Sequence, residues 1–200
     1  GKQRHEHDLL GGVLESARYR DLIGGWRHFL QDAPPAGPGP ANATRPLVEV
    51  TSHRIWRLYR RFADQAMAIH DKTPANAIHQ VRITAKKLRY LIDATRSLHD
   101  RRHVDPIIDR LKRVQSVLGA FNDAQVQERH LVDSGRALAD ANAGESGTLL
   151  TIGRLAETAR THAASFRAQV SGELLRFCRD EIRSEFGRLF KRAGTVPKSP

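Results

Sequence analysis

Residues 79–90, His-Gln-Val-Arg-Ile-Thr-Ala-Lys-Lys-Leu-Arg-Tyr, decide how the chain is expected to fold. Apolar residues recur here every three or four positions, the spacing of one buried helix face: Ile78, Val81, Ala85, Leu88 and Ile92. A basic stripe with the same spacing lies one step round the helix and consists of His79, Arg82, Lys86 and Arg89. No acid joins this stripe before Asp93, and like charges at such spacing destabilise a helix slightly. The basic stripe therefore predicts an anionic ligand.

The composition of the chain also favours binding to a polyanion. Its 200 residues carry 33 lysines and arginines against 22 acids, which gives a formal net charge of +11 and a pI of about 10.6. Such an excess is typical of proteins that bind nucleic acid, inorganic polyphosphate or an acidic membrane surface. Composition alone leaves open a basic protein without such a ligand, so the motifs must decide.

Cysteine content and hydropathy argue against several other classes. The single cysteine, Cys178, cannot form an internal disulfide or a cysteine-based zinc site, and its apolar neighbours predict a buried thiol rather than a nucleophile. No apolar run approaches the roughly 18 residues that a membrane span needs. The first residues lack the apolar segment of a signal peptide. We therefore expect a cytoplasmic protein.

Helical apolar spacing recurs along nearly the whole chain and predicts an all-α fold of six or seven helices. The expected helices cover residues 2–31, 46–69, 74–99, 105–118, 123–140 and 148–191, the last divided near Ser171-Gly172. Thr73-Pro74 and Asp105-Pro106 are predicted to start two of them as cap and first-turn pairs. No segment alternates apolar and polar residues over a convincing length, so no sheet is expected.

The expected connections are short compared with the helices. Residues 33–46 contain five prolines and two glycines, so they are predicted to be a loop between helices. A helix break is expected at Gly119–Asn122, a loop at Asn142–Gly147 and a frayed tail at 194–200. Long helices with short loops favour an antiparallel helical bundle. We expect residues 1–200 to form a single helical domain.

Two motifs in the chain resemble the signatures of the CHAD family, the conserved histidine α-helical domain. The first is Ile-His-Gln-Val-Arg-Ile-Thr-Ala-Lys-Lys-Leu-Arg-Tyr at 78–90. The second, Leu-Lys-Arg-Val-Gln-Ser-Val-Leu-Gly-Ala-Phe-Asn-Asp at 111–123, resembles the family pattern L-K-x-L-Q-x-x-L-G-x-x-N-D, with Val114 in place of the usual leucine. Ser16, Arg18 and Tyr19 match a looser upstream pattern. The resemblance covers most of the chain.

The resemblance implies that only part of a CHAD domain is present. A complete domain has two related helical halves, each opening with its own histidine- and arginine-rich helix, around a basic pore or groove. Only one such helix is found here, at residues 79–90. The chain therefore resembles the C-terminal half and the helix leading into it. We expect the N-terminal half to be missing, or the surface left open to be covered by self-association.

The resemblance also implies a function. By resemblance to CHAD proteins, the chain is expected to bind inorganic polyphosphate and to localise to polyphosphate granules. By motif match, the expected polyphosphate-binding residues are His79, Arg82, Lys86, Arg89 and Lys112. Structural roles are expected for Leu88, Tyr90, Gln115 and Leu118. We expect a module that binds without catalysis and needs neither metal nor cofactor.

Other functions stay open from the sequence. Nucleic-acid binding is the strongest rival, although no helix-turn-helix pattern stands out and the aromatic residues lie mostly on apolar faces rather than among the bases. A helical protein-interaction module is a second rival. A metal-dependent phosphohydrolase is less favoured, because His-Glu-x-x-His is absent and Arg101 and Arg102 lie beside His99 and His103. A structural hydrogen bond explains His79 as well as donation to phosphate does.

Overall fold

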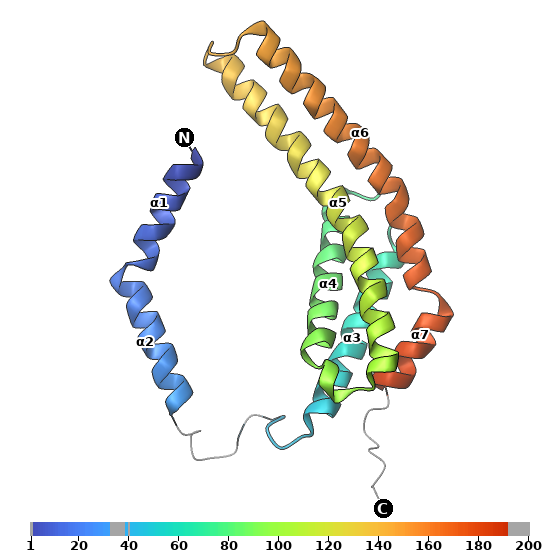
Figure 1. The fold of residues 1–200 in the computed structure, drawn as a ribbon. Coiled ribbons are helices and arrows are strands. Elements are labelled where there is room, and N and C mark those ends of the chain that lie inside the picture. The colour runs from blue at the N-terminus through green and yellow to red at the C-terminus, as the bar shows by residue number, and fades with distance from the viewer. Residues whose placement is uncertain (1, 33–38, 40, 192–200) are drawn as a thin grey trace, which may run out of the picture. The chain divides into compact units, whose positions relative to one another are not determined.

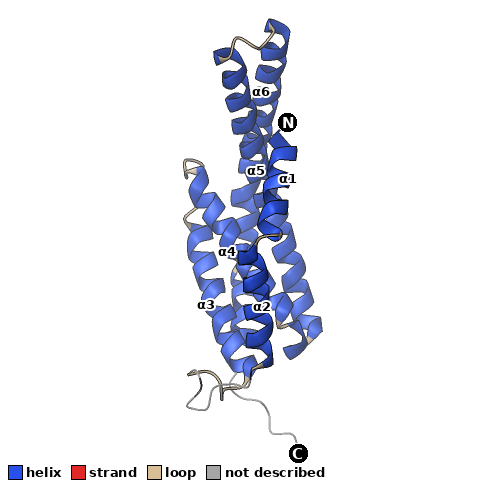
Figure 2. Ribbon diagram, turned by 90° about the vertical axis from the view of Figure 1, so that its left-hand side faces the viewer, coloured by secondary structure: helices blue, strands red, loops and turns tan. Residues whose placement is uncertain are grey.

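The computed structural model describes residues 2–32, 39 and 41–191, and these residues form helices and loops but no strand (Figure 2). Seven α-helices are present in this part of the chain, so the expected all-α fold is confirmed. The chain divides into two compact units, Gly1–Thr44 and Arg45–Pro200. Of the predicted loop at 33–46, residues 33–38 and 40 lie outside the described residues, and so does the predicted tail at 194–200.

The first unit contains two helices, α1 (Lys2–Leu14) and α2 (Ala17–Gln31), so the prediction of one continuous helix over 2–31 is wrong. The helix is interrupted at Ser16, which has an extended backbone and caps α2. Its Oγ accepts a hydrogen bond from the backbone N–H of Tyr19 at 3.2 Å and donates to the carbonyl of Val13 at 2.6 Å. A serine at such a position satisfies the unpaired N–H groups of a helix start, which favours a new helix over a continuous one.

The second unit is a bundle from which one helical hairpin extends (Figure 1). Its elements are α3 (Leu47–Met67), α4 (Ala75–Ala94), a 3₁₀ turn (Arg96–Leu98), α5 (Arg101–Asp140), α6 (Ser146–Phe177), α7 (Asp180–Phe186) and a π turn (Gly187–Lys191). Helices α5 and α6 lie side by side and run past the ends of α3 and α4. The predicted loop at Asn142–Gly147 is confirmed as the tip of this hairpin, although Ser146 and Gly147 already belong to α6.

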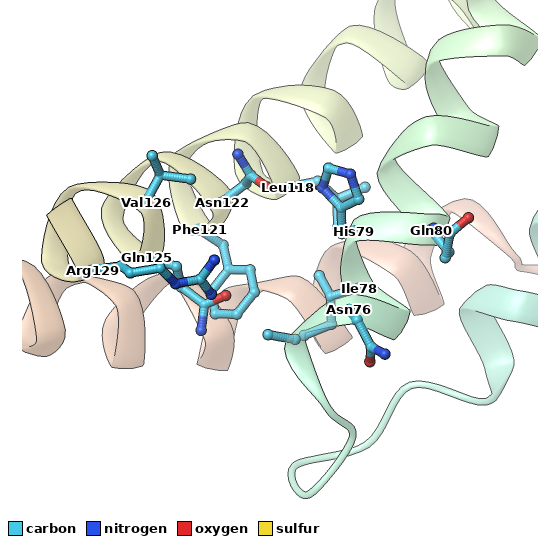
Figure 3. A pocket seen from close by; sticks show the side chains of 11 residues that line it. Asn76, Ile78, His79, Gln80, Leu118, Phe121, Asn122, Gln125, Val126 and Arg129 are labelled. Atoms are coloured by element: carbon cyan, nitrogen blue, oxygen red, sulfur yellow. Dashed lines mark hydrogen bonds between the residues drawn. The ribbon is translucent and has the colours of Figure 1, made fainter. Parts of the chain in front are cut away.

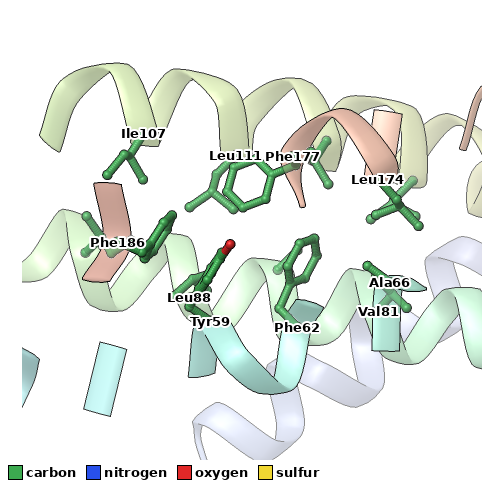
Figure 4. Packing of buried hydrophobic residues seen from close by; sticks show 14 of the residues in the cluster. Tyr59, Phe62, Ala66, Val81, Leu88, Ile107, Leu111, Leu174, Phe177 and Phe186 are labelled. Carbon is green, nitrogen blue, oxygen red and sulfur yellow. The ribbon is translucent and has the colours of Figure 1, made fainter. Parts of the chain in front are cut away.

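The core of the second unit is built from apolar residues at helical spacing (Figure 4). The predicted stripe of α4, from Ile78 to Ile92, is at most 1% exposed. The same holds for the apolar residues at this spacing on α5: Val104, Ile107, Leu111, Val114 and Leu118. Tyr59 of α3 packs flat on Phe186 of α7, with ring centroids 3.9 Å apart. Burial raises the pKa of Tyr59 to about 12, so its phenol stays neutral at physiological pH. The buried faces of α3, α4 and α5 thus set which sides of these helices face solvent.

Both predicted helix starts are wrong, because the proposed capping side chains have other partners. Thr73 Oγ1 accepts from the backbone N–H of His70 at 2.9 Å, and α4 begins one residue after Pro74 without a side-chain cap. Asp105 forms a two-pronged ion pair with Arg96, at 2.6 and 2.5 Å. Helix α5 begins earlier, capped by Asp100, and contains Pro106. The predicted extension of α4 to His99 is also wrong, since α4 ends at Ala94.

The predicted helix break at Gly119–Asn122 is wrong as well. Helix α5 runs without interruption over 40 residues, since the side chain of Asn122 bonds to His79 of α4 instead of capping a new helix. The predicted division at Ser171-Gly172 also lies inside a continuous helix, α6. That stretch divides at Cys178 and Arg179 instead. A single glycine weakens a helix by only about 1 kcal/mol, which packing between α5 and α6 outweighs.

His99 gives the fold a dependence on pH. Its Nε2 is buried without a hydrogen-bond partner among the described residues, and its ring stands edge-on to Phe190 at 5.1 Å. Burial lowers the pKa of His99 below its ordinary value. Folding therefore favours the neutral ring, and stability is lost as pH falls below the ordinary histidine pKa of about 6.5.

We expect the His99→Gln variant to lose less stability than the wild type on acidification, because glutamine does not titrate. Urea unfolding at neutral pH and at about pH 5 measures the two losses. Comparing the losses removes the contribution of the other titrating groups, which both proteins share. Equal losses in the two proteins would show that His99 is not the group responsible.

Candidate functional site

The basic stripe lies where α4 packs against α5. Gln115 of α5 joins the two helices by two hydrogen bonds. Its Nε2 donates to the carbonyl of Ala85 at 2.9 Å, and its Oε1 accepts from Nε of Arg89 at 2.7 Å. The structural role expected for Gln115 is therefore visible as a bridge that fixes the separation of α4 and α5 beside the basic stripe.

Arg82 and Lys86 line one hollow of about 310 Å³, together with Tyr90, Gln115 and Ser116. We call it the arginine–lysine hollow. No acid is among these five lining residues. Neither Arg82 nor Lys86 has an ion-pair partner in the part of the chain that the structure describes, although Lys86 Nζ lies 5.6 Å from the centre of the Tyr90 ring. Two cations with no acid to neutralise them can therefore both direct their charge at an anion in this hollow.

Arg89 lies beside this hollow but is already engaged. Its Nη1 donates to Asp93 Oδ2 at 2.8 Å and its Nε to Gln115, and its side chain is only 21% exposed. Its guanidinium carbon lies 4.6 Å from the centre of the Tyr90 ring. In this arrangement Arg89 holds Gln115 and Tyr90 in place, and its charge is partly balanced by Asp93.

His79 lines a second hollow, again of about 310 Å³, at the first turns of α4 (Figure 3). We call it the histidine hollow. The Nδ1 of His79 lies 2.9 Å from Oδ1 of Asn122 in α5. With the proton on Nδ1, the neutral ring donates this bond and keeps Nε2 as an acceptor. Protonation makes Nε2 a second donor, which is what an anion requires.

Lys112 is not brought to either hollow. It is not among the residues that line them, and its Nζ forms an exposed ion pair with Asp109 at 2.9 Å. Of the five predicted site residues, the structure therefore gathers Arg82 and Lys86 in one hollow. Arg89 lies at its edge, and His79 lies in the neighbouring hollow.

Comparison with known families supports this arrangement of motifs. The family model described as CHAD domain matches residues 1–132, which include the basic stripe and the bridging residues of α5. The chain belongs to the CHAD domain family. A search of curated proteins finds no match to it.

Several residues that line the two hollows of this CHAD domain were not predicted as site residues. Ser116 and Tyr90 line the arginine–lysine hollow, whereas Gln125 and Arg129 line the histidine hollow. Helical spacing from Asn122 to Arg129 could have placed Arg129 on the same face of α5. The prediction of a helix break at Gly119–Asn122 hid this relation.

The described part of this CHAD domain was also compared with the needs of a metal ion, a reactive thiol and a membrane span. Within it, no three histidine, cysteine or acidic side chains gather as a metal ion would require. Burial raises the pKa of the Cys178 thiol to about 11, so the thiol stays protonated near neutral pH. None of the helices described is both long and apolar enough to cross a membrane.

Proposed function

We propose that this CHAD domain binds inorganic polyphosphate along the α4–α5 surface, with Arg82 and Lys86 as its main cationic contacts. One observation carries the proposal: both cations line the same hollow, and neither pairs with an acid among the described residues. An arginine offers forked donors and a lysine a mobile point charge, and both suit the oxygens of a phosphate chain. Family membership supports the same ligand class.

The binding is expected to be electrostatic and independent of sequence. A polyphosphate chain carries about one charge per unit and releases counterions when cations of the protein neutralise it. Arg82 and Lys86 both stand on helix α4, whose backbone is already ordered. Binding of a phosphate chain therefore has to order little more than these two side chains. We propose a module that binds polyphosphate without catalysis, metal or cofactor. Binding to polyphosphate would place the protein at polyphosphate granules.

Nucleic-acid binding is the second candidate, and Tyr90 is the observation that favours it. Its side chain is 50% exposed at the edge of the arginine–lysine hollow, and an exposed aromatic ring can stack on a base. However, Arg89 and Lys86 already lie against this ring, at 4.6 and 5.6 Å from its centre. This arrangement favours a ligand without bases.

Titration with polyphosphate, DNA and RNA at equal total charge, repeated at several salt concentrations, tests the proposal. We expect polyphosphate to bind more tightly than either nucleic acid throughout, with an affinity that falls as salt rises. Tighter binding of DNA or RNA would favour the second candidate. Phosphate release during the same titration would contradict a module without catalysis.

Self-association, expected as a way to cover surface that a missing half would leave exposed, also stays a prediction. Large apolar side chains of α1 and α2 are between 45% and 66% exposed: Leu9, Leu10, Val13, Leu14, Leu22, Trp26, Phe29 and Leu30. Monomeric proteins rarely leave large apolar patches exposed to water. We expect sedimentation velocity to show a mass that rises with protein concentration. A constant monomer mass would contradict this expectation.

A further inference from the structure

The histidine hollow extends past the first turn of α4, because α5 continues beyond it. Arg129 and Gln125, one turn apart on α5, line this end of the hollow (Figure 3). Arg129 is exposed and has no ion-pair partner within the described residues. No acid is among the residues that line the hollow. An unpaired cation therefore stands at the far end of the same helix pair that holds Arg82 and Lys86.

Gly119 lies on α5 between the two hollows, one turn from both Ser116 and Asn122. A Cβ placed at this glycine would meet nothing within 4 Å, so the surface between the hollows is open here. Ser116 and Arg129 are about 20 Å apart along the helix axis. A flexible phosphate chain that crosses at Gly119 can therefore contact Arg129 as well as Arg82 and Lys86 only if it is long enough to span this distance.

The charge pattern of α5 marks where this surface ends. Beyond Arg129 the same helix face carries Asp133, Arg136 and Asp140, with acids and bases alternating. Arg136 thus lies between two acids and outside both hollows, although it has the same charge and lies on the same face as Arg129. Arg129 attracts an approaching anion, whereas the alternating acids and bases beyond it largely cancel and attract the anion only weakly.

We infer that Arg129 is a second phosphate contact, which gives the α4–α5 surface a preference for long polyphosphate over short. This inference rests on the proposed function of Arg82 and Lys86. A short chain held in the arginine–lysine hollow does not reach Arg129. A long chain passes over Gly119 and adds the contact in the histidine hollow.

Binding of two chain lengths to single variants tests the inference. The short probe is the shortest polyphosphate that the wild type binds measurably, chosen with an extended length below the roughly 20 Å between Ser116 and Arg129. The long probe is a long-chain polyphosphate at the same salt concentration. We expect Arg129→Ala to weaken binding of the long chain by about tenfold, as one charge-assisted contact would, and that of the short chain less than about twofold. Arg136→Ala, the matched control, should change neither by more than about twofold.

The outcomes separate this inference from the proposed function. Equal losses for the two lengths, no loss for either, or the same loss in Arg136→Ala would overturn the role of Arg129. The double variant Arg82→Ala/Lys86→Ala serves as the reference. If it loses affinity for both lengths while Arg129→Ala keeps the wild-type affinities, only the second contact fails. If the double variant binds both lengths as the wild type does, the proposed function itself fails.

Discussion

Replacing Arg82 and Lys86 together by alanine is expected to remove most of the affinity for polyphosphate while leaving the fold intact. Each side chain should contribute about 1–2 kcal/mol, because each contact to phosphate is charge-assisted but partly exposed to water. The double variant should therefore bind about 2–4 kcal/mol more weakly. Alanine favours helix, and neither side chain forms an ion pair among the described residues. Circular dichroism should consequently show unchanged helix content.

The salt dependence of binding provides a second measurement on the same variant. Fewer phosphates are neutralised when two cations are missing, so fewer counterions are released. The slope of log affinity against log salt concentration should become shallower by about 1.4–1.8. Lys87→Ala is the control, since Lys87 is exposed and neighbours Lys86 but lines neither hollow. If Lys87→Ala weakens binding as much as Lys86→Ala, diffuse net charge accounts for binding. Wild-type affinity in the double variant would falsify the proposed site.

Arg89→Ala is expected to act differently from the other two substitutions. Removal of this side chain takes away a donor to Gln115 and leaves the carboxylate of Asp93 unpaired beside the hollow. An unpaired acid repels an anion, so part of any loss reflects Asp93 rather than a lost phosphate contact. For this reason Arg82 and Lys86 form the cleaner test, although the basic stripe contains all three.

The buried faces of the helices could be predicted from the sequence, whereas their ends could not. The apolar stripe from Ile78 to Ile92 repeats at helical spacing because each of its residues packs into the core. The spacing of apolar residues therefore indicates directly which helix face is buried. A helix end depends on whether the capping side chain bonds to the helix backbone or to another partner in the fold. Asp105 is a good capping residue in isolation, but Arg96, nine residues earlier, pairs with it once the chain turns back.

The candidate site shows the same limit. The basic stripe could be predicted because it lies on one helix, and helical spacing alone aligns Arg82 with Lys86. The division of the surface into two hollows depends on how α5 crosses α4. Two hydrogen bonds fix this crossing, one between Gln115 and Ala85 and one between Asn122 and His79. These contacts join residues 30 and 43 positions apart, and no local pattern encodes them.

The return of α7 onto α3 is another long-range contact, and it leads to the largest expected effect on stability. Phe186 of α7 is fully buried. It stacks on Tyr59 with 11° between the ring planes and packs edge-on to Phe177 at 6.0 Å. Phe186→Ala would leave a cavity that these neighbouring rings cannot fill, in addition to the lost transfer of the ring from water. We expect a loss of about 3–5 kcal/mol in the free energy of unfolding.

Chemical denaturation of the second unit measures this loss, and Leu150→Ala in the same unit is the control. Leu150 of α6 is a large apolar residue that is 68% exposed, so its truncation should change stability by less than about 0.5 kcal/mol. Phe186 lies far along the chain from the α4–α5 hollows and lines neither of them. The Phe186→Ala protein that remains folded should therefore bind polyphosphate as the wild type does. A loss of stability below about 1 kcal/mol would mean that α7 is not anchored on α3 in solution, since a buried stacked ring cannot be removed at so small a cost.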